Sequence, residues 1–236
     1  MTRVISVVGT AGGVGASVLT AALATRASEL GAAVVAVDAR PFGGGLDVLL
    51  GADEEQGLRW RDLADAVGVL DGAALFGRLP LAGRTGMLSF DRDRPMIPSV
   101  DVLRGVMDAL ARVSDIIVVD APRAGEVWEE AVADLSDEVI ALTGTTIPAL
   151  TGAAASVRHL DAVHDGLWLA CRTDRSNPVV PETVAHCLEV PLLGTVATDA
   201  RVTTALSEGR HPPTRGAFGK SVDALLGRLQ PLRRTA

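Results

Sequence analysis

The chain has 236 residues, of which 48% are hydrophobic, so it is long enough to bury the core of one domain or of two. Its formal net charge is −7, and it has no tyrosine, four phenylalanines and three tryptophans. A general nucleic-acid binder needs basic surface and rings that stack on bases, so we expect no nucleic-acid partner. No apolar run approaches the roughly 18 residues of a membrane span. Together these properties favour a cytoplasmic globular protein.

The two cysteines and the first residues argue against a disulfide-rich, a metal-binding or a secreted protein. Cys171 and Cys187 are too few for a disulfide framework and have no metal-binding spacing, so we expect buried, reduced thiols. The opening MTRVISVVGTAGG has an apolar run too short for a signal peptide, and is more typical of a first strand. Both features agree with a cytoplasmic protein.

Strand and helix patterns alternate along the chain. Val4–Val8 is a β-branched run typical of a strand buried on both faces, and a glycine-rich turn and a helix over about 15–30 follow it. No linker-like stretch interrupts the alternation, so we predict a single domain, 1–236, with a doubly wound, mostly parallel α/β fold. Further strands are expected at 33–37, 87–90, 115–119, 138–142, 167–171 and 192–196, and helices near 99–113, 125–134, 147–163, 181–188, 199–208 and 217–229.

Three polar segments are expected at one edge of this sheet. In open parallel sheets, ligands bind beyond the carboxyl ends of the strands. The glycine-rich turn, Asp38 and Asp120 each follow a predicted strand directly. The sequence therefore predicts a ligand site where these segments meet.

The glycine-rich turn VVGTAGGVGAS, residues 7–17, has most of the parts of a phosphate-binding loop. Its glycines let backbone N–H groups surround phosphate oxygens, and Ser17 offers a hydroxyl for Mg²⁺. Ala16 stands where such a loop has its lysine, and Lys220 is the single lysine among 22 basic residues. The alternative is a strand-to-helix turn that binds no ligand.

The loop resembles the deviant Walker A motif of the MinD/ParA superfamily. The pattern KGGxGKT is matched by AGGVGAS, residues 11–17, with Ala11 and Ala16 at both lysine positions. Residues 34–51 resemble the second motif, in which Asp38 matches the first acid and Arg40 replaces the second. Residues 116–123 (IIVVDAPR) resemble the Walker B segment, and residues 190–212 resemble the segment that carries the nucleotide-base loop.

This resemblance implies a set of site residues. Ser17 would bind Mg²⁺ directly, and Asp120 through water. ATP with Mg²⁺ is the expected ligand, bound weakly or not at all, and no residue is assigned a catalytic role. The implied nucleotide-binding residues are Gly12, Gly13, Val14, Gly15, Ala16, Ser17, Val18, Asp38 and Asp120.

Loss of both lysines predicts little or no hydrolysis. Phosphoryl transfer depends largely on positioning and on positive charge around the phosphates, and a cation acting across a dimer can be worth about 10³–10⁵ in rate. Arg40 removes a carboxylate that the family uses to position the attacking water. It either returns positive charge to the phosphates or is a surface arginine.

Finer similarities narrow the family. Residues 57–80 and the short strand 87–90 are similar to the actinobacterial CpaE/TadZ-like proteins, often called septum-site-determining proteins. Those relatives usually carry a receiver-like segment before the first strand, and we expect none in this sequence. The resemblance implies a positioning or regulatory factor for a Tad-type pilus or secretion machine or for septum placement, recruited to the pole, the septum or the inner membrane face. It also implies a homodimer joined across the nucleotide face, where loss of the lysines would reduce like-charge repulsion.

Two other classes stay open. A Rossmann dinucleotide enzyme would explain the acid at Asp38, but Val18 stands where its third glycine belongs, and the lack of tyrosine excludes a reductase that uses a catalytic tyrosine. A protein-interaction scaffold that binds no nucleotide is the other class.

The histidines are scattered and are assigned no catalytic role. None has a nucleophile or metal partner in the sequence: His159, His164, His186 and His211.

The last predicted helix allows two interpretations. Its apolar stripe is followed by Pro231 and by Arg233 and Arg234, which is compatible with a membrane-targeting helix. Such stripes are more often packed against a core, and we expect that here. The stripe consists of Phe218, Val222, Leu225, Leu226 and Leu229.

Overall fold

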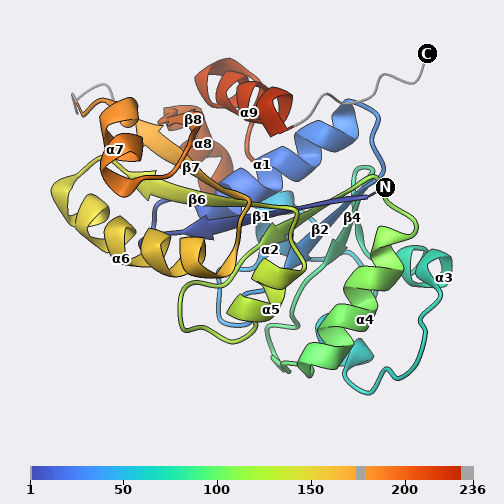
Figure 1. Ribbon diagram of the computed structural model, residues 1–236. Helices are drawn as coiled ribbons and strands as arrows, with labels where there is room; N and C mark the ends of the chain where they lie inside the picture. Colours follow the sequence, from blue (N-terminus) through green and yellow to red (C-terminus); the bar gives the residue numbers. More distant parts are fainter. Residues whose placement is uncertain (1, 174–178, 230–236) are drawn as a thin grey trace, which may run out of the picture.

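The structure is a computed structural model, which describes residues 2–173 and 179–229. Over these residues an eight-stranded sheet has the order β3-β4-β2-β5-β1-β6-β7-β8, parallel except for the β3–β4 hairpin (Figure 1). This is the mostly parallel, doubly wound α/β architecture that the sequence predicts. The strands are β1 Arg3–Gly9, β2 Val34–Asp38, β3 Leu81–Ala82, β4 Thr85–Leu88, β5 Ile116–Asp120, β6 Glu138–Gly144, β7 Leu167–Thr173 and β8 Leu192–Ala197.

Helices cover both faces of the sheet. In Figure 1, α1 and α9 lie above the sheet, and α4, α5 and α6 lie below it. Two clusters of buried side chains correspond to these layers, one formed with α1, α2 and α9 and one with α3 to α7. The helices are α1 Ala16–Glu29, α2 Leu46–Leu50, η1 Trp60–Leu63 (a 3-10 helix), α3 Gly72–Phe76, α4 Val100–Ala111, α5 Glu129–Asp134, α6 Ile147–Val163, α7 Pro181–Leu188, α8 Ala200–Ser207 and α9 Gly216–Leu229.

The strand register brings the predicted polar segments together. β1 lies between β5 and β6, and Val7 of β1 is level with Asp120 at the end of β5. Asp38, at the end of β2, is the register partner of Asp120. The glycine-rich loop after β1 therefore lies beside both acids, as the sequence predicts.

Two predicted elements are displaced. The strand expected at 87–90 is Thr85–Leu88, because residues from Gly86 onward pair with β2. The helix expected at 125–134 begins only at Glu129, since Trp128 has φ 70 and so cannot continue a right-handed helix towards the N-terminus. Glu126, which was expected in this helix, therefore lies in the loop before it.

The region between Gly51 and Leu81 folds into short elements that periodicity did not predict. Its main buried anchor is Trp60, whose ring contacts Phe90 and Trp128 at centroid distances of 6.1 and 4.9 Å. All three rings are buried. The Trp60 Nε1–H donates a 2.7 Å hydrogen bond to the backbone oxygen of Asp38, so this cluster supports the end of β2.

The last helix packs against the core. All five residues of the predicted stripe are buried. Leu226 is 4% exposed, and the other four are at most 3% exposed: Phe218, Val222, Leu225 and Leu229. Pro231, Arg233 and Arg234 lie outside the described residues. Within the described part of the chain, no helix is both long and apolar enough to cross a bilayer.

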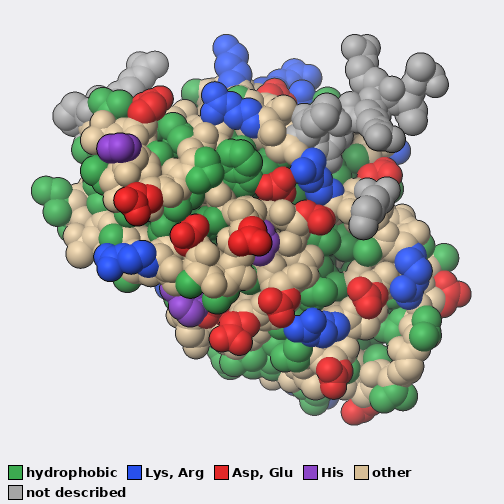
Figure 2. All heavy atoms as spheres, in the orientation of Figure 1, with side chains coloured by type: hydrophobic (Ala, Val, Ile, Leu, Met, Phe, Trp, Pro, Cys, Tyr) green, Lys and Arg blue, Asp and Glu red, His purple; other side chains and the backbone are tan. Residues whose placement is uncertain are grey.

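The surface is mixed in charge. On the face formed by α4, α5 and α6, acidic side chains are interspersed with hydrophobic and scattered basic ones (Figure 2). One prediction about the thiols is wrong: Cys171 is buried, as expected, but Cys187 is exposed on α7. The polar face of that helix points to solvent, so its thiol is accessible.

We expect Trp60→Ala to destabilise the fold by about 3–5 kcal/mol, because it removes a fully buried ring and leaves a cavity beneath β2. The measurement is chemical unfolding followed by circular dichroism. Phe42→Ala is the control: this ring is 82% exposed, and its loss should change the free energy of unfolding by less than about 0.5 kcal/mol. Equal effects of the two substitutions would contradict the assignment of Trp60 as an anchor.

Candidate nucleotide site

The loop after β1 has the backbone conformation of a phosphate cradle. Gly13 and Gly15 have φ values of 72° and 100°, which strain any residue with a Cβ atom. Gly15 caps α1 without a side-chain hydrogen bond. The first N–H groups of α1 are therefore open to a ligand, and the positive end of the helix points at it.

A cavity of about 610 Å³ opens in front of this loop. Six of the nine residues implied by the resemblance line it: Gly13, Val14, Gly15, Ala16, Ser17 and Val18. Gly12 is exposed beside the cavity, whereas Asp38 and Asp120 are buried, at 2% exposure each. The two acids thus lie behind the cavity wall and do not form it.

Asp38 holds the backbone that follows β2. Its Oδ1 accepts a 2.9 Å hydrogen bond from the Arg40 N–H, and its Oδ2 accepts a 3.1 Å bond from the Leu46 N–H. Burial, followed by the nearby charge of Asp120, raises the pKa of Asp38 to about 7, although both hydrogen bonds oppose the shift. In this structure the side chain therefore shapes the loop from Arg40 to Leu46.

Asp120 connects the buried acids to the glycine loop. Burial raises its pKa to about 6, and contact with the Ser17 hydroxyl and the charge of Arg40 oppose that shift. Its Oδ1 atom is buried and has no hydrogen-bond partner among the described residues. The structure thus brings Ser17 and Asp120 together, as expected of a Walker-type pair.

Three arginines from three strand ends surround the loop. Arg40 follows β2, Arg123 follows β5, and Arg172 lies at the end of β7, and all three line the cavity. The Arg172 Nη1 donates to the backbone oxygens of Gly13 and Val14, at 3.5 and 3.2 Å. Arg123 and Arg172 were not predicted from the sequence as site residues, although both occupy the strand ends where ligands bind in such sheets.

These arginines provide the positive charge that the missing lysines would have supplied. Ala16 is 7% exposed and packs into the core, and among the described residues no lysine lines the cavity. A guanidinium is always charged and can make two parallel hydrogen bonds to a phosphate. The loop therefore faces a cationic cavity despite its two alanines.

The opposite wall of the cavity is partly apolar. It comprises Val196 from β8, Val202 and Leu206 from α8, and Phe218 from α9, a surface suited to a flat ring. Thr198 and Thr203 add hydroxyls. The cavity thus combines the glycine loop on one side with an apolar wall on the other.

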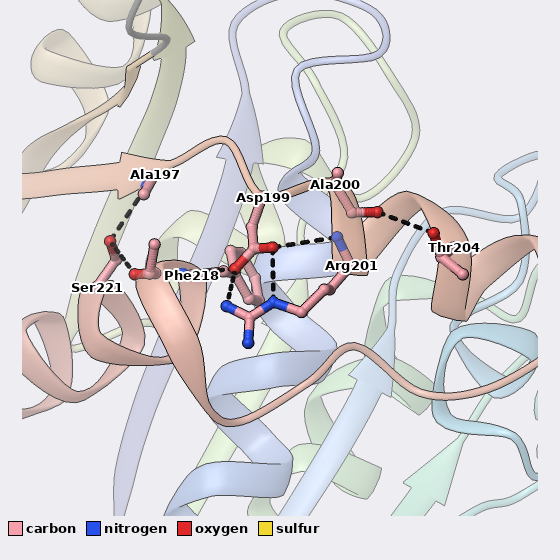
Figure 3. Close-up of polar contacts among 8 residues, drawn as sticks. Ala197, Asp199, Ala200, Arg201, Thr204, Phe218 and Ser221 are labelled. Carbon is pink, nitrogen blue, oxygen red and sulfur yellow. Dashed lines mark hydrogen bonds and ion pairs between the residues drawn. The ribbon is translucent and has the colours of Figure 1, made fainter.

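Asp199 holds this wall in place (Figure 3). It caps α8, its carboxylate lies 2.6 Å from the Arg201 Nη2, and it accepts a 3.5 Å hydrogen bond from the Phe218 N–H. The bond from Arg201 is the main reason why the pKa of Asp199 falls to about 2. An Asp directly before a helical pattern is a sequence signal for an N-cap, so this residue could have been found.

Few carboxylates of the described residues reach the cavity. Both acids behind the wall are buried, and the Glu126 carboxylate near Arg40 accepts a 2.9 Å bond from the Arg123 N–H. No described carboxylate other than Asp199, which is engaged by Arg201, lines the cavity to position a water. The polar groups that face the loop are therefore mainly backbone N–H and guanidinium donors.

Comparisons with solved structures identify this architecture. The structure superposes on a ParA family ATPase from Chlorobium tepidum with a TM-score of 0.83, at 17% identity over 97% of this chain and 98% of that one. It superposes on the septum site-determining protein MinD of Pyrococcus horikoshii, solved with Mg-ADP, with a TM-score of 0.74, at 22% identity over 98% and 97%. The fold is that of the MinD and ParA ATPases. The resemblance inferred from the glycine loop is thereby confirmed, and the Rossmann alternative is not supported.

Sequence relatives agree with this fold. The chain is 25% identical over 260 residues to the septum site-determining protein MinD of Buchnera aphidicola, a match that covers 99% of this chain and 94% of that protein. It is 32% identical over 206 residues to an uncharacterized protein of Mycobacterium tuberculosis, over 87% of this chain and 57% of the relative. The chain thus spans little more than half the length of that relative. No model of a known protein family matches the chain. The narrower resemblance to CpaE/TadZ-like proteins stays a prediction.

The raised pKa of Asp38 predicts an unusual pH dependence of stability. The folded state keeps the Asp38 proton up to about pH 7, whereas the unfolded chain releases it near the ordinary value of 3.8. This contribution is therefore fully present below about pH 4 and is lost as the pH rises through 7, with a slope of at most about 1.4 kcal/mol per pH unit. Asp120, at about 6, acts in the same direction.

Urea unfolding between pH 4 and pH 8, measured for the wild type and for Asp38→Asn, tests this linkage. The Asn variant should lose part of the decline in stability with pH, whatever its absolute stability. Asp71→Asn, at an exposed helix N-cap, is the matched control and should keep the wild-type slope. Identical slopes for all three proteins would contradict the prediction.

Proposed function

We propose that this chain is a degenerate MinD/ParA-type factor that binds a nucleotide such as ATP weakly at its glycine loop and hydrolyses it little or not at all. The observation that carries the proposal is the composition of the cavity wall. A glycine cradle, an apolar slot and three arginines line the cavity, while both lysine positions of the motif are alanine. Such a wall provides binding groups and lacks the groups that activate water.

The same wall accounts for weak binding. Arg172 is engaged by the carbonyls of Gly13 and Val14, and Arg40 lies beside Ser17 and Glu126, so each arginine exchanges an existing partner when a phosphate binds. That exchange reduces the net gain of each new hydrogen bond. Binding in the absence of the lysines then depends on Arg40, Arg123 and Arg172 with the N-terminus of α1.

We further propose that the domain, residues 1–236, positions or regulates a larger apparatus through self-association and partner binding. A relative of this chain is named a septum site-determining protein, and a structural neighbour is a complex of MinC with MinD. By analogy, the apparatus is either the division septum or a Tad-type pilus or secretion machine. The protein would act in the cytoplasm and be recruited to the pole, the septum or the inner membrane face.

A nucleotide-independent dimeric scaffold is the second candidate, and exposed apolar side chains favour it. Phe42 and Ile147 are 82% and 80% exposed, and Val127 and Met96 are 53% and 50% exposed. These four residues follow β2, β6, β5 and β4 respectively, so they surround the carboxyl edge of the sheet. Apolar side chains gathered at one edge suit a homodimer or a protein partner.

Charge gives the two candidates different expected behaviour. The loss of both lysines predicts less repulsion between two copies, but Arg40, Arg123 and Arg172 return positive charge to this edge. Two such faces repel each other until an anion lies between them. A bound nucleotide would therefore promote dimer formation, whereas a pure scaffold would be dimeric without it.

Calorimetric titration with ATP, together with single-turnover hydrolysis assays, tests nucleotide binding. We expect saturable, weak binding and no hydrolysis above background. Arg172→Gln should weaken binding at least about tenfold, because a charge-assisted hydrogen bond is worth about 1.5–3 kcal/mol and the loop loses its support. Arg158→Gln, exposed on α6, is the matched control and should bind as the wild type does.

Three outcomes would contradict this proposal or a part of it. Hydrolysis of ATP at the rates of lysine-containing relatives would show that the site is not degenerate. Absence of binding by the wild type, with a dimer already present, would favour the scaffold. Equal weakening by Arg172→Gln and Arg158→Gln would show that charge in general, and not the loop contact, controls affinity.

Analytical ultracentrifugation tests the proposed dimer face. We expect Phe42→Asp and Ile147→Asp to shift the protein towards monomer, because each places a charge among apolar side chains that meet their copies across the interface. Val69→Asp is the control: Val69 is 93% exposed but precedes α3, away from the four apolar residues. A dimer unaffected by all three substitutions would place the interface elsewhere.

A further inference from the structure

The candidate magnesium position contains a guanidinium group. In a phosphate-binding loop of this kind, Mg²⁺ is bound by the loop hydroxyl and lies close to the acid at the end of the neighbouring strand. Here those groups are Ser17 and Asp120. The Arg40 Nη1 lies 3.5 Å from the Ser17 Oγ, and the charge of its guanidinium partly opposes the rise in the pKa of Asp120 that burial causes.

Arg40 is held in this position by its own backbone and by Glu126. Its N–H donates to Asp38, and its carbonyl accepts a 3.0 Å bond from Gly43. The Arg40 Nε lies 3.8 Å from the Glu126 Oε2, and the side chain is only 18% exposed. The guanidinium is therefore largely buried in the site, and its Nε has no hydrogen-bond partner among the described residues.

These residues do not fit a magnesium ion well. The Oδ1 of Asp120 lacks a partner among the described residues, which alone would suit a cation. Mg²⁺, however, requires six oxygen ligands at about 2.0–2.1 Å and usually keeps several waters. A guanidinium at the hydroxyl both repels a divalent ion and takes the space of its waters.

We propose that Arg40 takes the place of the magnesium ion, so that this site binds the phosphates of a nucleotide without a divalent metal. The inference rests on the proposed function, since it presumes that a nucleotide binds. Arg40, Arg123 and Arg172 together present guanidinium groups from three directions, and such groups recognise phosphate oxygens directly. The preferred ligand is the metal-free anion, and Mg²⁺ competes by neutralising it.

The test is calorimetric titration with ATP and with ADP, each in excess EDTA and in excess MgCl₂. For the wild type, we expect an affinity in EDTA equal to that in MgCl₂, or up to tenfold higher. Arg40→Ala should lose at least tenfold in affinity in EDTA and should then bind more tightly when Mg²⁺ is present. Arg104→Ala, which removes an exposed arginine paired with Asp134 on the surface, is the control and should keep the wild-type ratio.

A conservative variant distinguishes loss of the guanidinium group from misfolding. Arg40→Lys keeps the charge but loses the planar fork, so it should stay independent of Mg²⁺ with an affinity between those of the wild type and Arg40→Ala. Wild-type binding that requires Mg²⁺ overturns this inference and leaves the proposed function in place. Absence of binding in both buffers overturns the proposed function, and the inference falls with it.

Discussion

The site depends on the burial of two carboxylates side by side. Asp38 and Asp120 end neighbouring central strands in register, and each is 2% exposed. Burying acids is costly unless they are hydrogen-bonded or neutralised, so the surrounding chain is arranged to meet that requirement. The backbone N–H groups of Arg40 and Leu46 bind Asp38, and Ser17 and Arg40 lie next to Asp120.

That requirement explains why Arg40 belongs to the site and is not a surface residue. Its N–H binds one acid while its guanidinium lies near the other, so the segment after β2 is tied to the glycine loop. Trp60 adds a hydrogen bond to the Asp38 carbonyl from the aromatic cluster below. Charge that a phosphate-binding loop usually carries on lysine is therefore supplied from neighbouring strand ends, by residues whose positions serve the fold as well.

The two walls of the cavity have different origins. The cradle depends on positive φ values at Gly13 and Gly15, which local sequence dictates. The apolar slot depends on Asp199, which joins α8 to the start of α9 through Arg201 and Phe218. The cavity between the two walls thus results from contacts between segments that lie far apart in the chain.

Much of the fold followed from local sequence. Parallel strands buried on both faces read as continuous β-branched runs, so β1, β2 and β5 were predicted to within a residue or two, and α6 and α7 had their predicted bounds. Elements of two to five residues between Gly51 and Ala82 carry too few turns to show a period, and they were missed. The helix expected from residue 125 begins later for a different reason, because the positive φ at Trp128 keeps residues 125–128 out of the helix although their pattern continues it.

By itself the sequence determined the doubly wound fold, the glycine cradle, the loss of both lysines and the placement of two acids at strand ends, because each of these depends on residue type and local spacing. Only the tertiary structure decided which charges face the cradle. Arg123 and Arg172 are separated from the loop by more than 100 residues, and the direction of a side chain at a strand end is set by the register of the sheet and by packing around it. The same holds for Arg40, whose position beside Ser17 follows from the burial of Asp38 and Asp120 and from no pattern within its own segment.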